Sequence, residues 1–361
     1  MSTTTTTHRD TMHRDTSHRS DSRRHAARRT RAAVALTAAT ALLTVAACTP
    51  AQDGADPSGT PGTSDGGPAG ATPVTLGLTY VPDIQFAPFY VAEANGYYDE
   101  AGFDVELRHH GSNEGLFTAI EQGAEDLVVA SGDEVLTERA TGGDLAQIAT
   151  LYQRSPVALL VPEDSAARTP QDLAGLTIGV PGEYGATWLG LLTLLDGAGL
   201  STADVTVQSI GFTQTTALLN GDVDAVMGYV NGDAVRLAAA GMPVRALEPG
   251  ALVSVGVAVP DTSDLTPEQQ AAFVAATLRG VGDTIADPEA AVEIAADVIP
   301  GMTSAARTDA LAVLEATVPL LSTTGTTDPA QWEAMGQAML AAGMIEAVPD
   351  GGYRDVAQAS S

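Results

Sequence analysis

The segment "AIEQGAEDLVVASGDE" (Ala119–Glu134) recurs as "ALLNGDVDAVMGYVNG" (Ala217–Gly232) at a constant offset of 98 residues. Each copy has the pattern of a helix that ends at a glycine, a tight turn with an aspartate, a buried strand and a polar loop. The shared residues are Gly123 with Gly221 and Asp126 with Asp224. We interpret the repeat as two similar α/β lobes, and the alternative is a common helix-to-strand turn used twice by chance.

Short apolar runs along the chain predict strands, and several of the segments between them have helical apolar spacing. The runs are "VTLGLTY", "FDVELRHH", "DLVVAS", "AQIATLYQ", "VALLVPE", "LTIGVPG", "VTVQSIG", "DAVMGY", "PVRALEP" and "LVSVGVAVP". Strands that alternate with helices favour mostly parallel sheets covered by helices on both faces. After Pro260 the pattern is all-helical, with Asp287-Pro288 and Asp328-Pro329 as expected helix starts. We expect residues 74–155 and 255–361 to form the first lobe and 156–254 the second.

The N-terminal segment has the pattern of a bacterial export signal. Arginines from Arg23 to Arg31 precede an apolar run of 16 residues, 32–47, which is shorter than the roughly 20 that span a bilayer. The run ends in "VAAC", which resembles a lipobox, and Cys48 is the only cysteine of the chain. We therefore expect residues 1–47 to be removed, Cys48 to be lipidated, and 48–73 to tether the body on the extracytoplasmic face of the membrane. An ordinary secretory signal with an incidental cysteine is the alternative.

Charge and composition argue against several classes of function. Residues 48–361 contain 9 arginines and 42 acidic residues, a net charge of −33, which repels nucleic acid. His109 and His110 are the only histidines of this part, and they have no metal-ligand spacing. No "GxSxG" nucleophile motif is present. We expect a monomer that is not an enzyme and holds no cofactor or metal.

Polar and aromatic residues gather where the expected strands end, which is the edge at which open α/β sheets bind ligands. Seven of the 16 aromatic residues also fall between Tyr80 and Phe103. The candidate ligand-binding residues are Tyr80, Asp83, Gln85, Phe86, Phe89, Ser131, Asp133, Gln153, Arg154, Glu183, Tyr184, Gly185, Thr187, Tyr229 and Asn231.

Some of these candidates also have a purely structural interpretation. Ser131 with Glu134 fits a capping box, and Asn231 is a favourable helix N-cap. Phe86 and Phe89 could seat the first helix on the sheet. The glycine-rich "GVPGEYGAT" precedes a helix and could hold an anion, although it matches no nucleotide-binding fingerprint.

Four segments together resemble the NMT1/THI5-like family of periplasmic-binding-protein folds. They are "YVPDIQFAPFYVAEANGYYDEAGFDVEL", "GAEDLVVASGDEVL", "YQRSPVALLV" and "DLAGLTIGVPGEYG". The resemblance implies a type II two-lobed fold that closes on a small ligand and delivers it to the transmembrane subunits of an ABC importer. It is strongest to lipoproteins that bind thiamine-precursor pyrimidines such as hydroxymethylpyrimidine. Riboflavin and small anions such as taurine or another aliphatic sulfonate are the alternatives.

The family that the chain resembles also includes fungal pyrimidine synthases. The composition of this chain argues against that enzymatic activity. Those enzymes consume a lysine-bound pyridoxal phosphate, and this sequence contains no lysine to form the Schiff base. In pyrimidine-binding relatives the opening motif is similar to "DWxPNxxHxxxYVA". Here Tyr80 stands in the position of the tryptophan, and Gln85-Phe86-Ala87 replaces the part with asparagine and histidine.

Overall fold

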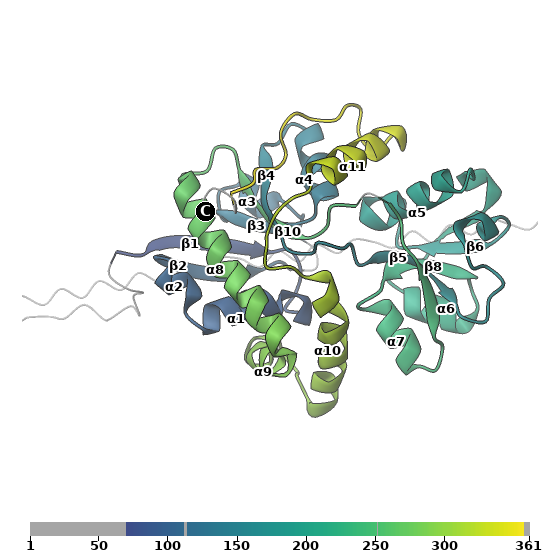
Figure 1. Ribbon diagram of the computed structural model, residues 1–361, viewed down its shortest axis with the longest axis horizontal. Helices are drawn as coiled ribbons and strands as arrows, with labels where there is room; N and C mark the ends of the chain where they lie inside the picture. The colour runs from purple at the N-terminus through teal and green to yellow at the C-terminus, as the bar shows by residue number, and fades with distance from the viewer. Residues whose placement is uncertain (1–69, 112–113, 251, 357–361) are drawn as a thin grey trace, which may run out of the picture. The chain divides into compact units, whose positions relative to one another are not determined.

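The computed structural model describes residues 70–111, 114–250 and 252–356 of the chain. The predicted signal segment, Cys48 and most of the predicted tether lie outside these residues. Within them, ten strands form two five-stranded sheets (Figure 1). Each apolar run that the sequence singles out contains one of these strands, so the predicted α/β class is confirmed.

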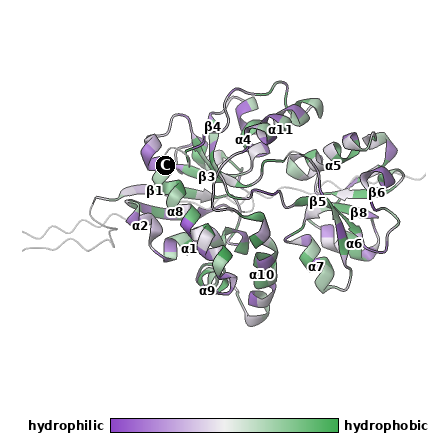
Figure 2. Ribbon diagram, viewed as in Figure 1, coloured by the Kyte–Doolittle hydropathy of each residue, from purple (hydrophilic) through white to green (hydrophobic). Residues whose placement is uncertain are grey.

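The first sheet has the strand order β2-β1-β3-β10-β4. Its strands are β1 (Thr72–Leu78), β2 (Phe103–His109), β3 (Leu127–Ala130), β4 (Leu145–Thr150) and β10 (Gly256–Pro260). β1 pairs in parallel with β2 and β3, whereas β10 runs antiparallel to β3 and β4. The buried strand β3 is hydrophobic along its length (Figure 2), and β10 is hydrophobic at its three central residues, as expected for a sheet covered on both faces.

The second sheet repeats this arrangement with the order β7-β6-β8-β5-β9. Its strands are β5 (Val157–Pro162), β6 (Thr177–Val180), β7 (Thr206–Ser209), β8 (Ala225–Tyr229) and β9 (Val244–Leu247). β6 pairs in parallel with β7 and β8, and β5 runs antiparallel to β8 and β9. β6, β7 and β8 thus correspond to β1, β2 and β3, which confirms that the sequence repeat is structural.

The two aspartates of the repeat close the same turn in both sheets. Asp126 accepts the N–H of Thr75 at 2.8 Å and donates its own N–H to the Thr75 carbonyl at 2.9 Å. Asp224 makes the equivalent pair of bonds with Thr177, at 2.7 and 2.8 Å. Asp126 therefore fixes the start of β3 against the middle of β1, and Asp224 fixes the start of β8 against the start of β6.

Eleven α-helices, counted over the described residues, cover the sheets. They are α1 (Ala87–Ala94), α2 (Tyr97–Glu100), α3 (Thr118–Glu121), α4 (Gly132–Ala140), α5 (Gly185–Gly197), α6 (Gln214–Asn220), α7 (Asp233–Ala239), α8 (Pro267–Ala286), α9 (Pro288–Val298), α10 (Ser304–Thr317) and α11 (Pro329–Ala341). Asp287 and Asp328 cap α9 and α11 with proline in the first turn, as predicted. In the described part of the chain, no helix combines the length and the apolar character needed to cross a membrane.

Helix α8 lies against α1 (Figure 1), and a glycine allows the close approach. A Cβ atom on Gly280 would stand 2.2 Å from the carbonyl oxygen of Pro88, so no larger residue fits there without movement. This contact holds the segment that follows β1 against the C-terminal helices. It thereby fixes the start of α1 below the end of β1.

The chain crosses between the sheets twice, after β4 and before β10, and the two crossing segments are joined to each other. We define them as residues 151–156 and 248–255. The N–H groups of Leu151 and Tyr152 donate to the carbonyl of Val255 at 3.0 and 3.1 Å. The two crossings therefore act mechanically as one paired connection.

We predict that Asp224→Ala destabilises the protein by about 1–3 kcal/mol, the range for a lost hydrogen bond to a charged group. The neighbouring Asp222→Ala is the matched control, because among the described residues the Asp222 side chain has a single hydrogen bond, which spans 3.5 Å to Asn220 on the surface. Chemical denaturation measures both variants. Equal stability of the two would contradict the role of Asp224 in the turn.

Candidate functional site

Four exposed aromatic rings follow the carboxyl ends of parallel strands. Tyr80 follows β1, Tyr184 follows β6, Phe212 follows β7, and Tyr229 ends β8. Their exposed fractions are 53, 59, 80 and 39%, and the other aromatic residues among those described are buried or half-buried. Three of the four come from neighbouring strands of the second sheet, which lie about 4.8 Å apart. An aromatic surface therefore lies at the edge where α/β folds bind ligands.

Two glycines position the ring of Tyr184. The ring lies over Gly182, where an added Cβ would stand 2.2 Å from a ring carbon. Gly185, the first residue of α5, has a φ of 66°, a left-handed conformation that glycine adopts at little cost. The predicted "GEYG" segment thus turns sharply into the helix and leaves the tyrosine ring at the surface.

Ser131, Asp133 and Glu134, at the start of α4, form a hydrogen-bonded group that we name the acidic unit. The N–H of Ser131 donates to Glu134 Oε2 at 2.8 Å, completing the predicted capping box. Ser131 Oγ lies 2.7 Å from Asp133 Oδ1 and 2.8 Å from Glu134 Oε2. A hydroxyl carries one proton, so it donates fully to only one of the two oxygens unless a second proton is shared with a carboxyl group.

Burial agrees with this shared proton. Asp133 is only 3% exposed. Loss of solvation is the largest cause that raises the pKa of Asp133 to about 7, and the negative charge of Glu134 is the second. The hydrogen bond from the Ser131 hydroxyl lowers this pKa. Burial also raises the pKa of Glu134. Burial therefore favours protonation of the acidic unit.

Tyr229 connects the second sheet to the acidic unit of the first. Its ring is partly exposed, but its hydroxyl end is crowded by protein. Loss of solvation is the largest cause that raises the pKa of this hydroxyl. The negative charges of Glu134, Asp133 and Asp233 raise it further. Asp233 is buried and accepts the Tyr229 N–H at 3.0 Å, which anchors the backbone at this point. Residues from both sheets thus converge near the Tyr229 hydroxyl.

The two predicted phenylalanines lie in the core of the first sheet. Phe86 is buried and meets the ring of His109 edge-on, with 5.6 Å between the centroids. Phe89 is buried in α1 within the same core cluster. Their side chains seat α1 on the sheet, which is the structural interpretation that the sequence left open.

Gln153 and Arg154 lie in the first crossing segment. The amide of Gln153 donates to the carbonyls of Thr150 and Thr326, each at 2.8 Å. Arg154 donates to Glu248 of the second crossing segment at 2.9 Å. Gln153 therefore fastens the first crossing segment to residues 150 and 326, and Arg154 joins the two crossing segments.

The remaining predicted residues divide between exposed and internal positions. Asn231 is buried and donates to Thr317 Oγ1 of α10 at 2.9 Å, and it does not cap α7. Thr187 is buried in α5. Asp83 accepts the N–H of Gln85 at 3.1 Å as the cap of a short 3₁₀ turn, and Gln85 itself is exposed. Glu183 is exposed beside Tyr184.

Phe212 and Glu134 were not among the predicted site residues. Phe212 follows the strand "VTVQSIG", so the rule that found the other rings, applied to this strand, would have found it. Glu134 was considered only as a capping residue. Its link to Asp133 through Ser131 depends on side-chain geometry that the sequence does not encode by spacing.

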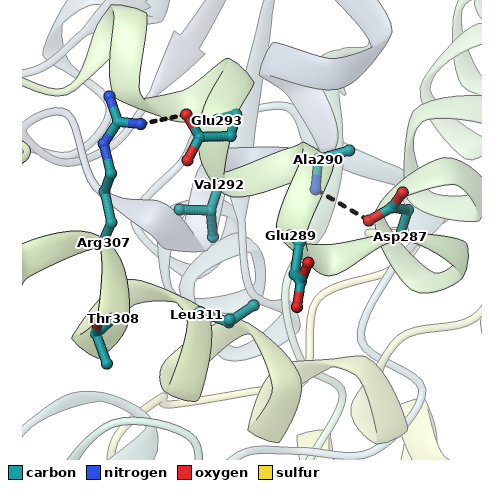
Figure 3. A pocket seen from close by; sticks show the side chains of 8 residues that line it. All are labelled: Asp287, Glu289, Ala290, Val292, Glu293, Arg307, Thr308 and Leu311. Carbon is teal, nitrogen blue, oxygen red and sulfur yellow. Dashed lines mark hydrogen bonds and ion pairs between the residues drawn. The ribbon is translucent and has the colours of Figure 1, made fainter. Parts of the chain in front are cut away.

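The hollow between α9 and α10 contains none of the predicted residues (Figure 3). Its polar groups serve the helices themselves, because Asp287 accepts the N–H of Ala290 at 3.0 Å and Arg307 pairs with Glu293. The hollow is therefore a surface valley between two helices. We place the candidate site at the strand ends instead.

The histidines serve structural contacts. His109 contacts the Tyr90 hydroxyl and the Tyr80 carbonyl, each at 3.1 Å, and burial lowers its pKa. His110 is buried and contacts Glu125 at 2.8 Å, beside Arg108. No group of three or more potential ligands suited to a metal ion occurs in residues 70–111, 114–250 and 252–356.

Comparison with known families adds to this geometry. The family described as NMT1/THI5 like matches residues 83–291, more than half of the chain. The chain belongs to the NMT1/THI5-like family. The riboflavin-binding protein RibY of Chloroflexus aurantiacus is 36% identical over 77% of this chain and 83% of its own length.

Two further relatives and one solved structure have lower sequence identity to this chain. The formylaminopyrimidine-binding protein of Halalkalibacterium halodurans is 27% identical over 61% of this chain and 69% of its own length. A 4-amino-5-hydroxymethyl-2-methylpyrimidine phosphate synthase of Legionella pneumophila is 24% identical over 73% of this chain and 84% of its own length. The periplasmic aliphatic sulphonate binding protein SsuA of Escherichia coli superposes with a TM-score of 0.62 at 15% identity, over 77% of this chain and 90% of its own. The predicted periplasmic-binding-protein fold is confirmed.

We predict that Asp133→Asn gains stability relative to wild type as pH rises from about 4 to about 7. The folded pKa of Asp133 lies above its ordinary 3.8, so ionising it in the folded protein costs free energy across this window. The variant removes this cost, on the order of 4 kcal/mol at pH 7. Thermal and chemical unfolding across pH measure the difference. Asp196→Asn, near the C-terminal end of α5, is the exposed control, and a pH-independent difference for Asp133→Asn would contradict the prediction.

Proposed function

We propose that this chain is the extracytoplasmic substrate-binding component of an ABC importer and captures a flat nitrogen heterocycle between two lobes. Its transmembrane permease subunits are the partner, and lipidation at Cys48 anchors it to the membrane. The exposed rings Tyr80, Tyr184, Phe212 and Tyr229 at strand ends carry this proposal. Exposed aromatic rings at a sheet edge suit stacking on a planar ligand, which contributes about 0.5–1.5 kcal/mol per ring pair beyond burial.

Among heterocycles we place riboflavin first and a hydroxymethylpyrimidine-type ligand second. The sequence alone favoured the pyrimidine. The 36% identity to a riboflavin-binding protein, against 27% to a formylaminopyrimidine-binding protein, supports the change of order. The aromatic surface also supports it, because four rings offer more stacking area than a single six-membered ring can use. Asp133 and Glu183 would accept hydrogen bonds from ring N–H groups or an exocyclic amine.

Capture would proceed by closure of the lobes about the two crossing segments, 151–156 and 248–255. Their mutual hydrogen bonds, together with the Arg154–Glu248 pair, make a paired connection of the kind that hinge motion uses. The exposed Arg154–Glu248 pair itself contributes little to stability. Ligand contacts on both lobes would shift the population toward the closed form.

A sulfonate ligand and an enzymatic function have less support. A sulfonate needs a cation at the site, and Arg154 already pairs with Glu248. Among the site residues that we retain, the charged ones are the carboxylates Asp83, Asp133, Glu134 and Glu183. A pyrimidine synthase of the fungal type needs a lysine, and the sequence has none.

Titration with riboflavin, hydroxymethylpyrimidine and taurine, followed by calorimetry and flavin fluorescence, tests the proposal. We expect riboflavin to bind, with quenching of its fluorescence by the stacked rings, and taurine not to bind. Binding of taurine alone would overturn the heterocycle proposal. Turnover of any of the three compounds would overturn the assignment as a binding protein.

Truncation of the aromatic rings should weaken heterocycle binding. We predict that Tyr184→Ala, Phe212→Ala and Tyr229→Ala each raise the dissociation constant about tenfold, which corresponds to a loss of about 1.4 kcal/mol. Tyr97→Ala is the matched control, because Tyr97 precedes β2 and lies at the opposite edge of the first sheet. Unchanged affinity in all three variants would show that the ligand binds elsewhere.

A further inference from the structure

The charges around the candidate aromatic surface are unbalanced. Asp83, the acidic unit and Glu183 all follow strand ends of the two sheets. Of the two nearby arginines, Arg154 is already paired, whereas Arg236 is exposed and forms no ion pair among the described residues. Arg154 pairs with Glu248 at 2.9 Å, and the charge of Arg236 acts on Asp233, one turn before it in α7. The imidazole of His109 is neutral near pH 7, because burial lowers its pKa.

The acidic unit follows β3, whose neighbour β1 is followed by the exposed Tyr80. Its carboxylates act on the Tyr229 hydroxyl from the first sheet, and Asp233 acts on it from the second. α11 and the segment before β10 contribute the apolar Trp332, Met335 and Val253 beside Gly132. No cation is therefore supplied to the acidic unit by these packed elements, and a ligand here meets net negative charge.

We propose that the acidic unit makes this protein selective for the uncharged form of its heterocycle and excludes the phosphorylated form. The inference rests on the proposed function and states which form of the ligand the same site binds. Like charges brought together in a desolvated site cost several kcal/mol, so a phosphate ester is penalised whether or not its ring stacks well. A neutral ring instead donates its N–H groups to the same carboxylates.

This selectivity distinguishes the chain from a site built to hold anions. A site for phosphate or sulfonate needs unpaired arginine or lysine side chains, or free helix N-termini, facing the ligand. At α4 the helix start is already occupied, because the N–H of Ser131 bonds to Glu134. At α4 the carboxylate thus takes the place that an anionic ligand would use, whereas the start of α5 has no side-chain cap.

The test compares riboflavin with riboflavin 5′-phosphate on the full-length protein by fluorescence titration. We expect the dissociation constant of the phosphate ester to be at least about 100-fold higher than that of riboflavin. The ratio of the two dissociation constants should fall as the salt concentration rises. In Asp133→Asn/Glu134→Gln the ratio of the two dissociation constants should fall about tenfold, even if both ligands bind more weakly. The exposed Glu183→Gln gives a second, milder reduction of the ratio, and Glu163→Gln, after the antiparallel β5, is the control.

The outcomes separate the inference from the proposed function. Equal affinity of wild type for both flavins would overturn the inference and leave the proposed function standing. A large ratio of the two dissociation constants that is unchanged in the acidic-unit and Glu183 variants would also overturn the inference, because the exclusion of the phosphate ester would then have another cause. If the protein bound neither flavin, and neither hydroxymethylpyrimidine nor its phosphate, the proposed function would be overturned. The inference would then fall with it.

Discussion

The parallel pairing of β1 with β3 and of β6 with β8 is the constraint on which the candidate site depends. Asp126 and Asp224 fix these pairs just before β3 and β8 begin, through hydrogen bonds to Thr75 and Thr177. Parallel strands run in one direction, so the loops that follow them leave at one edge of the sheet. Tyr184 and Tyr229 are brought near one another in this way, although 45 residues separate them in the sequence.

The fold was predictable from the sequence because its signals are local and repeated. Each strand is a short apolar run, and the glycine and aspartate turn recurs at a fixed offset. The helix starts at Asp287 and Asp328 follow from capping chemistry within a few residues. The division into two sheets then follows from which strands can pair in parallel through a helical crossover.

The candidate site was less predictable, because side-chain roles depend on partners far along the chain. Arg154 was a candidate for an anion, but its partner Glu248 is 94 residues away. Asn231 bonds to Thr317 of a later helix, and Phe86 turns into the core because the 3₁₀ turn before α1 points it there. Phe212 was missed although the strand-end rule applies to it. Strand ends thus indicate where a ligand binds, and contacts decide which residues remain free to bind it.

The central claim is that a flat, uncharged heterocycle stacks on the aromatic residues at the strand ends. A crystal structure of the protein grown with riboflavin tests it most directly. The account predicts the ring system against Tyr184 and Tyr229, with a ring N–H or carbonyl edge toward Asp133 and Glu134. Density for the flavin in the valley between α9 and α10 (Figure 3), or anywhere away from these rings, would contradict it.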